Sequence, residues 1–551
     1  MATVQDIPFR DIPHQSALFL SYLDCLPQAL RFYPHSPNIE SMVRLARDGI
    51  AGRPFPRKEM ASILVRQNEN FGSDTETLRQ AGELEKLDSV AVLTGQQVGL
   101  FTGPVYTVYK ALTALGIANE LKKLGIPAVP IFWMDTEDHD LPEVTRRTVW
   151  ENPSSIRALD YRTVLFRETG MPAGSVGSLR FPETIREAVD DYVSRLPGTR
   201  WKPEVQSLLE SAYRPGSTFA LAFARVMARL FRGSGLLLFD PHDAEAKRLA
   251  SGVFQKALSD ADSLHSALER RNQELHAAGF HAQVSVMENS TVLFFSAGDE
   301  RRALERRASG FGLKNGDRTF GLDELLECAG QNPELFSPNV LLRPLVQDSL
   351  FPTVAYVGGS SELAYFAQIE AIYTQFGRPM PIVWPRNSFT ILEPEVAAEM
   401  DRRSIGLRDC FKGAQYLIEK AIRHSGLAAT TERLETLHRN LDCALTEIKP
   451  EVQSMEPTLA QALETARRKM LHNLQHLKAQ VVRMEGSQDP AVLDAIHLLS
   501  NHCYPDQTLQ ERQWGIPHFL ARHGYSVLDT IRKHTEIGSF AHRVLRLENG
   551  A

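Results

Sequence analysis

Three carboxylates surround one imidazole in the run Glu137-Asp138-His139-Asp140. A histidine beside carboxylates has a raised proton affinity, which suits acid–base catalysis near neutral pH. The same oxygen ligands would prefer Mg²⁺ to Zn²⁺. The alternative is that these acidic residues complement the dipole of a helix N-terminus. Because the run follows a predicted buried strand, we interpret it as a candidate catalytic cluster.

A glycine-rich turn is the second candidate. Gly95, Gly99 and Gly103 follow an apolar run, and Pro104 then opens an amphipathic helix. Glycine permits close backbone approach, and a helix N-terminus attracts phosphate. The turn is neither a P-loop nor GxGxxG, and many strand-to-helix turns need glycine for structure alone. We predict that Gly99 and Gly103 contact a nucleotide. Substrate contacts are predicted from the polar side chains of Gln96, Gln97, Thr102, Tyr106 and Lys110.

Further polar residues follow other apolar runs. Guanidinium groups bind phosphate or carboxylate, so Arg386 is a candidate, although a surface ion pair explains it equally well. Near the C-terminus an aromatic ring and an arginine suit a nucleotide base and its phosphates, although the tryptophan could simply pack the tail onto the core. We predict substrate contacts from Gly358, Gly359, Glu362 and Arg386. Nucleotide contacts are predicted from Ser388, Gln510, Arg512 and Trp514.

The composition limits the class of protein. The 551 residues are 43% hydrophobic, enough for two or three domains, and the net charge of −6 argues against nucleic acid as a partner. No apolar window is long enough to span a membrane, and the N-terminus lacks a secretion pattern, so we expect a cytoplasmic protein. The five cysteines form no CxxC pair, which predicts neither a disulfide framework nor a zinc site.

Five continuous apolar runs must position these residues. Runs of this kind, separated by helical patterns, are typical of buried parallel strands, and their carboxyl ends carry the polar clusters. The long gaps between runs predict inserts at about 150–230 and 275–345. The second insert should hold a strand pair at 282–287 and 291–295, followed by arginines on a solvated helix face. The predicted core strands are residues 90–93, 129–134, 236–239, 354–357 and 382–384.

Beyond the last predicted core strand, the spacing of apolar residues becomes helical. Apolar residues recur every three or four positions over 434–455 and 459–484, which predicts an antiparallel helical hairpin broken near Pro450 and Pro457. Its apolar stripe exceeds what two helices can cover, so we expect a homodimer through this region. The predicted organisation is a core at 1–395, a coiled-coil domain at 396–500, and a segment at 501–551 that returns to the core.

Several motifs occur together and in order. They are TGQQ (94–97), GLFTGPVY (99–106), YK (109–110), EDHD (137–140), LRPLVQD (342–348), AYVGG (355–359), GRPMP (377–381) and LQER (509–512). Nearly end to end, the chain resembles the cysteine ligase family of bacillithiol biosynthesis. The resemblance implies an α/β fold: a Rossmann-like, nucleotidyltransferase-type parallel sheet with two inserted connecting subdomains, plus an α-helical coiled-coil domain through which the family dimerises. It also implies addition of L-cysteine to glucosaminyl malate.

Forming that amide requires an activated carboxylate, so we expect ATP as the energy source, with Mg²⁺ as its partner ion. Two departures from related folds argue against ordinary carboxylate adenylation. The helix after the first core strand lacks phosphate-binding histidines, and Pro385-Arg-Asn-Ser388 replaces a lysine-rich loop. The alternatives are a non-catalytic nucleotide- or substrate-binding protein of the same pathway, or another nucleotidyltransferase acting on a small acid.

Overall fold

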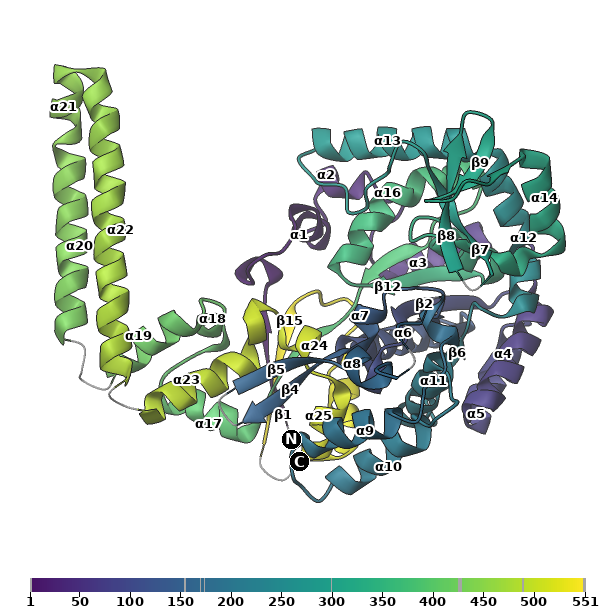
Figure 1. The fold of residues 1–551 in the computed structure, drawn as a ribbon, viewed down its shortest axis with the longest axis horizontal. Coiled ribbons are helices and arrows are strands. Elements are labelled where there is room, and N and C mark those ends of the chain that lie inside the picture. Colours follow the sequence, from purple (N-terminus) through teal and green to yellow (C-terminus); the bar gives the residue numbers. More distant parts are fainter. Residues whose placement is uncertain are drawn as a thin grey trace.

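A five-stranded parallel sheet forms the centre of the protein (Figure 1). The computed structural model describes residues 2–152, 155–168, 170–172, 174–298, 300–424, 429–487 and 490–548. Each predicted apolar run is a strand of this sheet, which confirms the Rossmann-like fold class. In spatial order the strands are β13 (Ile382–Pro385), β12 (Thr353–Gly358), β2 (Val90–Gln97), β3 (Ala128–Asp135) and β6 (Leu237–Phe239).

The sheet is buried on both faces, which is why its strands are continuously apolar. Helix α6 (Tyr106–Lys123) connects β2 to β3, and α16 (Ser360–Phe376) connects β12 to β13. From β2 the chain runs to β3 and β6 on one side, and later to β12 and β13 on the other. The strand order therefore reverses between β2 and β12. Such a switch point leaves a crevice at the carboxyl ends of the strands, where α/β proteins bind ligands.

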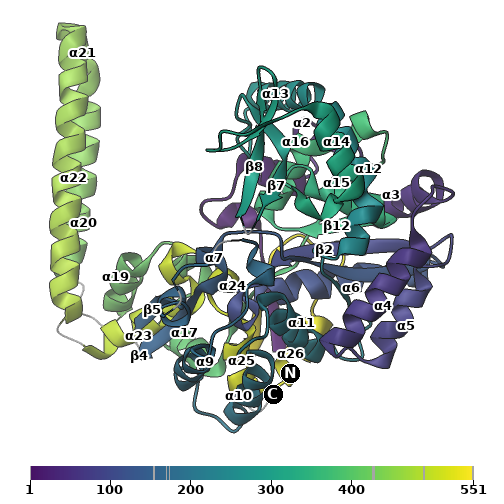
Figure 2. The same cartoon turned by 45° about the vertical axis from the view of Figure 1, so that its right-hand side comes forward.

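The first long connection, between β3 and β6, begins with α7 (Leu141–Thr145) and a hairpin of β4 (Arg146–Asn152) and β5 (Ser155–Asp160). The short helix α8 (Arg162–Leu165) comes next in the chain. Three longer helices follow and lie below the sheet in Figure 2: α9 (Ile185–Ser194), α10 (Lys202–Ala212) and α11 (Phe219–Leu230).

The second connection contains a separate antiparallel sheet, in the order β10-β9-β8-β7-β11. Its shorter strands are β9 (Gly310–Leu313), β10 (Thr319–Phe320) and β11 (Phe336–Pro338). Here the predicted hairpin is wrong. Strand β7 (Ser290–Ala297) pairs with β8 (Glu300–Arg307), not with residues 282–287, which form no strand. The turn lies at Gly298, whose φ of +64° favours glycine, so the strand partner follows β7 instead of preceding it. The predicted helix of arginines is therefore strand β8.

The two ends of the chain meet in a third sheet. Strand β15 (His542–Leu547) pairs antiparallel with β1 (Ala2–Ile7) and parallel with β14 (Ser388–Leu392). Figure 1 shows the termini side by side. This sheet holds the C-terminal strand β15 beside β14, which directly follows the last strand of the central sheet.

A helical hairpin projects from the rest of the molecule (Figures 1 and 2). Helix α20 (Ala429–Glu447) and the short α21 (Lys449–Met455) lie against α22 (Pro457–Ser487), which confirms the predicted hairpin and its breaks at the prolines. Helices α19 (Ala414–His424) and α23 (Pro490–Cys503) join it to the core. Within the described ranges, none of the helices is both long and apolar enough to cross a membrane.

Candidate active site

The switch point between β2 and β12 opens into a cavity of about 270 Å³. Many of the predicted site residues line it: Gln96, Gln97, Tyr106, Lys110, Gly359, Glu362, Arg386 and Arg512. Other lining residues were not predicted, and these are chiefly Asp135, Glu143, Arg343, Tyr356, Ser360, Ser361 and Tyr365. The cavity thus collects side chains from strands and helices that are far apart in the sequence.

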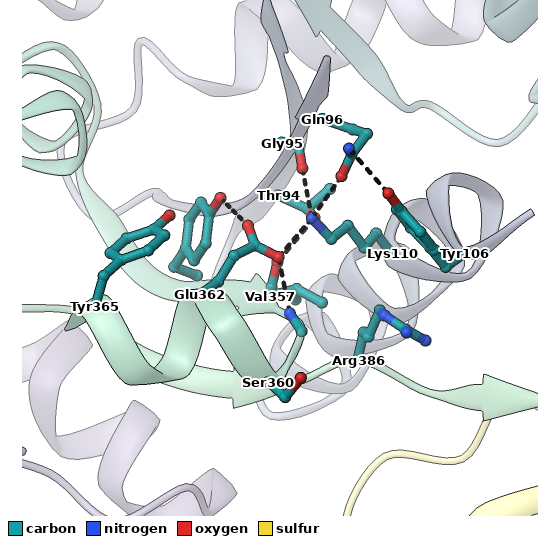
Figure 3. Close-up of polar contacts among 12 residues, drawn as sticks. Thr94, Gly95, Gln96, Tyr106, Lys110, Val357, Ser360, Glu362, Tyr365 and Arg386 are labelled. Atoms are coloured by element: carbon teal, nitrogen blue, oxygen red, sulfur yellow. Dashed lines mark hydrogen bonds and ion pairs between the residues drawn. The ribbon is translucent and has the colours of Figure 1, made fainter. Parts of the chain in front are cut away.

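An ion pair between α6 and α16 forms the floor of the cavity (Figure 3). The Lys110 ammonium lies 2.5 Å from a carboxylate oxygen of Glu362 and donates to the carbonyl of Gly95 (2.8 Å) and to Oε1 of Gln96 (2.9 Å). Burial lowers the pKa of Lys110, and Glu362 opposes that shift. The amide of Gln96 in turn donates to the hydroxyl of Tyr106 (3.2 Å). Lys110 therefore fixes the end of β2 at the cavity.

The Glu362 carboxylate is fully occupied by protein groups. It accepts from the Tyr356 hydroxyl (2.7 Å) and from the backbone N–H of Gly359 (2.8 Å), besides its contact with Lys110. Burial alone would raise its pKa, but Lys110 and these hydrogen bonds lower the pKa overall. A side chain at Gly358 would lie 2.9 Å from Cβ of Glu362, so this turn needs glycine. The glycine turn serves to place Glu362.

A second cationic group stands on the opposite wall. Arg343, near the start of α15 (Arg343–Leu350), donates to the hydroxyls of Tyr365 (2.8 Å) and Tyr356 (3.2 Å) and to Gln347 (3.1 Å). These partners are all neutral, so the positive charge of Arg343 is not cancelled by them. The wall can therefore attract an anionic group of a ligand.

Arg386 marks the boundary between this cavity and a neighbouring one. Its guanidinium pairs with Glu511 at 2.6 Å and lies over the ring of Tyr106 at 5.2 Å. The pair is buried, so the surface ion pair considered from the sequence is instead an internal one. The second cavity, of about 320 Å³, shares Arg386, Arg512 and the turn at 359–361 with the first. Arg512 reaches Oγ of Ser360 at 3.4 Å between them.

The predicted catalytic run does not converge on one point. Glu137 is buried and pairs with Lys247 of α12 (Ala244–Ser259). Asp138 accepts from the amide of Gln97, and Asp140 caps α7 by accepting from a backbone N–H at 3.0 Å. His139 is mostly exposed, 3.3 Å from Arg301. In the described part of the chain, no group of three or more histidine, cysteine or carboxylate side chains is placed to hold a metal ion.

The Gly99–Gly103 turn is filled by protein. The guanidinium of Arg147 occupies the space beside Gly99 and donates to the carbonyl of Leu100 at 2.5 Å. Thr102 is buried, and its hydroxyl donates to the carbonyl of the preceding residue. At the N-terminus of the following helix, the N–H of Val105 donates to the carbonyl of Trp514 (2.7 Å). The structure therefore does not bring Gly99, Thr102 or Gly103 to the cavity.

Three other predicted nucleotide contacts also lie in the interior. The side-chain amide of Gln510 hydrogen-bonds with the backbone of Ile391 and His502. The hydroxyl of Ser388 hydrogen-bonds with Glu511 and His542. Trp514 is 2% exposed and stacks on Trp150 with ring centroids 5.0 Å apart. Their polar and aromatic groups have protein partners, so their surroundings give no support to a nucleotide contact at Gln510, Ser388 or Trp514.

Comparison with known proteins shows which family this chain resembles over nearly its whole length. Residues 3–387 match the model of the N-terminal Rossmann-like domain of BshC of bacillithiol biosynthesis, and residues 389–547 match its C-terminal coiled-coil domain. The chain belongs to this family. It is 34% identical to "Putative cysteine ligase BshC" of Salinibacter ruber, over 96% of both chains. A relative of the same name from Koribacter versatilis is also 34% identical, over 95% of this chain and 96% of its own.

The family motifs contained signals that residue-by-residue interpretation missed. Arg343 lies in the LRPLVQD motif and Tyr356 in the AYVGG motif, so both stood in runs already singled out. Asp135 ends β3 and lies two residues before the acidic run at 137–140. The end of a parallel strand is where a ligand-facing side chain is expected, and this rule would have favoured Asp135 over the run at 137–140.

Proposed function

We propose that this protein joins the carboxyl group of L-cysteine to the amine of glucosaminyl malate, forming the amide of bacillithiol in the cytoplasm. The cavity at the switch point is the observation that supports this most. It combines cationic groups suited to carboxylates with an open carboxylate suited to an amine. The relatives from Salinibacter ruber and Koribacter versatilis both carry the name of a putative cysteine ligase. The proposed reaction needs a site of this mixed charge because its substrates carry both kinds of group.

The charges suggest how the substrates lie. Arg343, held by two tyrosine hydroxyls, supplies a positive charge that suits a carboxylate of the malate group. Gln96 and Gln97 at the end of β2 suit the hydroxyls of the sugar ring. The amine would then face Asp135, which lies opposite Gln97 in the strand register and lines the same cavity. The second substrate, cysteine, would then lie beside Arg386 and Arg512 at the boundary between the two cavities.

Nucleotide dependence is a further part of the proposal. Arg512 and the serines at the start of α16 offer donors that fit phosphate oxygens, and they face both cavities. A bound nucleoside triphosphate, with Mg²⁺ on its phosphates, would supply the energy that makes the cysteine carboxyl reactive. The protein's own residues would hold both substrates in line and exclude water, which would otherwise compete with the amine.

The test is to supply purified protein with cysteine, glucosaminyl malate, ATP and Mg²⁺, and to detect the thiol product by mass spectrometry. We expect product only in the complete mixture, with stoichiometric nucleotide cleavage. Malate glucoside lacking the amine serves as the control and should give none. If the complete mixture yields no product, while cells deleted for the gene still make bacillithiol, the proposed function is wrong.

A further inference from the structure

Asp135 stands out among the acidic groups of the cavity because its side chain has no partner. It is the last residue of β3 and lies beside Gln97 of β2 in the parallel register. Its carboxylate lines the cavity, and among the described residues it makes no hydrogen bond or ion pair. A half-buried carboxylate without a donor is costly, so such a group is a candidate for contact with a ligand.

The other carboxylates of the cavity are already engaged. Glu362 is held by Lys110, a tyrosine hydroxyl and a backbone N–H. Glu143 of α7 receives a hydrogen bond from Gln97. Within the part of the chain that the structure describes, this leaves Asp135 as the acidic side chain of the cavity whose oxygens are open to a proton from a ligand.

The charged groups around Asp135 come from three segments. Arg343 faces it from α15, Arg301 from β8, and Asp138 and Glu137 from the run after β3. Both arginines are committed elsewhere: Arg343 to its tyrosines, and Arg301 to Oγ of a serine at 2.7 Å and a proline carbonyl at 3.1 Å. They therefore act on Asp135 through their field and leave its oxygens free.

This environment adjusts the proton affinity of the carboxyl group. Burial raises the pKa of Asp135 to about 6; Arg343 and Arg301 work against the rise, while Asp138 and Glu137 add to it. A base is most effective when its pKa lies near the pH at which it works, because it must both accept and release a proton. An ordinary aspartate is too weak a base for that role, and burial makes Asp135 a stronger base by raising its pKa.

We propose that Asp135 is the general base that takes a proton from the amine of the sugar substrate as the amide bond forms. This inference rests on the proposed function. The amine nitrogen uses its electron pair to form the C–N bond to the cysteine carbonyl carbon, which a nucleoside triphosphate has made reactive. The bond from that carbon to its leaving oxygen breaks, and its electron pair departs with the oxygen. The proton from nitrogen goes to Asp135 and then to water.

The test compares the full-length protein with Asp135→Asn, which keeps the shape of the side chain but cannot accept the proton. We expect kcat to fall by about 100-fold or more. The dissociation constant for glucosaminyl malate, measured by calorimetry, should change little. In the parent, kcat should rise with pH through about 6, and this limb should be absent from the variant. Asp135→Glu should restore part of the rate together with the limb.

Two controls separate this role from a structural one. Asp88→Asn removes an exposed carboxylate at the opposite end of the sheet and should leave kcat and the pH profile unchanged. Circular dichroism should show both variants folded. An Asp135→Asn protein with the parent's kcat and pH profile would overturn the inference, as would one that loses only affinity for the amine substrate. If the parent itself makes no product, the proposed function fails first, and the inference fails with it.

Discussion

At the scale of residues, the Lys110–Glu362 ion pair lets us predict how removing one of its charges changes the stability of the fold. Both groups are largely buried, so removing one leaves the other charge without compensation. We expect Lys110→Met to lower the free energy of unfolding by about 3 kcal/mol. The double variant Lys110→Met, Glu362→Gln should recover most of that loss, yet both proteins should bind glucosaminyl malate more weakly. Urea unfolding and calorimetry measure the two effects. A single variant as stable as the parent would show that the pair is solvated.

The residue scale is also where the sequence was least informative. Types and spacing drew attention to Glu137, but not to Lys247, which lies 110 positions further along and neutralises it. Asp135 has the same side chain as Asp138, and the difference between them is only the lack of a partner in the folded chain. A partner supplied by a distant element cannot be deduced from local pattern, and the chemistry of a carboxylate depends on that partner.

At the scale of elements, the Gly99–Gly103 turn yields a prediction opposite to a phosphate-binding role. A Cβ at Gly99 would collide with the guanidinium of Arg147 and lie 3.1 Å from Cα of Gly103. Overpacking of this kind costs about 2 kcal/mol. We therefore expect Gly99→Ala to lower the free energy of unfolding by about that amount without changing the ligand affinities of the folded protein, as measured by urea unfolding and calorimetry.

The matched control is Gly82→Ala in α5 (Thr75–Glu83), where nothing lies within 4 Å of the added carbon. Because alanine favours a helix more than glycine, this change should be neutral or stabilising. The opposite result, in which Gly99→Ala leaves stability intact but weakens ATP binding, would restore the phosphate-binding interpretation of the turn.

The elements themselves were largely predictable where one local pattern sufficed. Continuous apolar runs identified all five core strands, because burial on both faces leaves no polar alternation to confuse with a helix. The sheet formed by β1, β15 and β14 was not predicted. Its pairing joins Ala2 to Leu547, at opposite ends of the sequence, and four residues of β1 are exposed, so β1 has no continuous apolar run that would reveal it as a buried strand.

At the scale of the whole molecule, the projecting hairpin lacks a core of its own. Among the described side chains of α20, α21 and α22, only Thr431 and Val482 are buried. Ion pairs link the two arms, such as Lys478 with Glu435 at 2.8 Å and Arg467 with Asp442 at 2.5 Å. Large apolar side chains along the hairpin remain exposed: Leu437, Ile448, Met455, Leu459, Met470, Leu477 and Met484.

A stripe of this length usually marks an interface, and twofold symmetry is the commonest way to cover it with a second copy. We therefore expect a homodimer through the hairpin. Leu437→Glu with Leu477→Glu places charges where the partner would cover them, which should give a monomer of unchanged helix content by light scattering and circular dichroism. Asn440→Glu with Gln480→Glu adds the same charge at exposed polar positions and should stay dimeric. A parent protein that is monomeric at micromolar concentration would contradict the expectation, because no second copy would then cover the stripe.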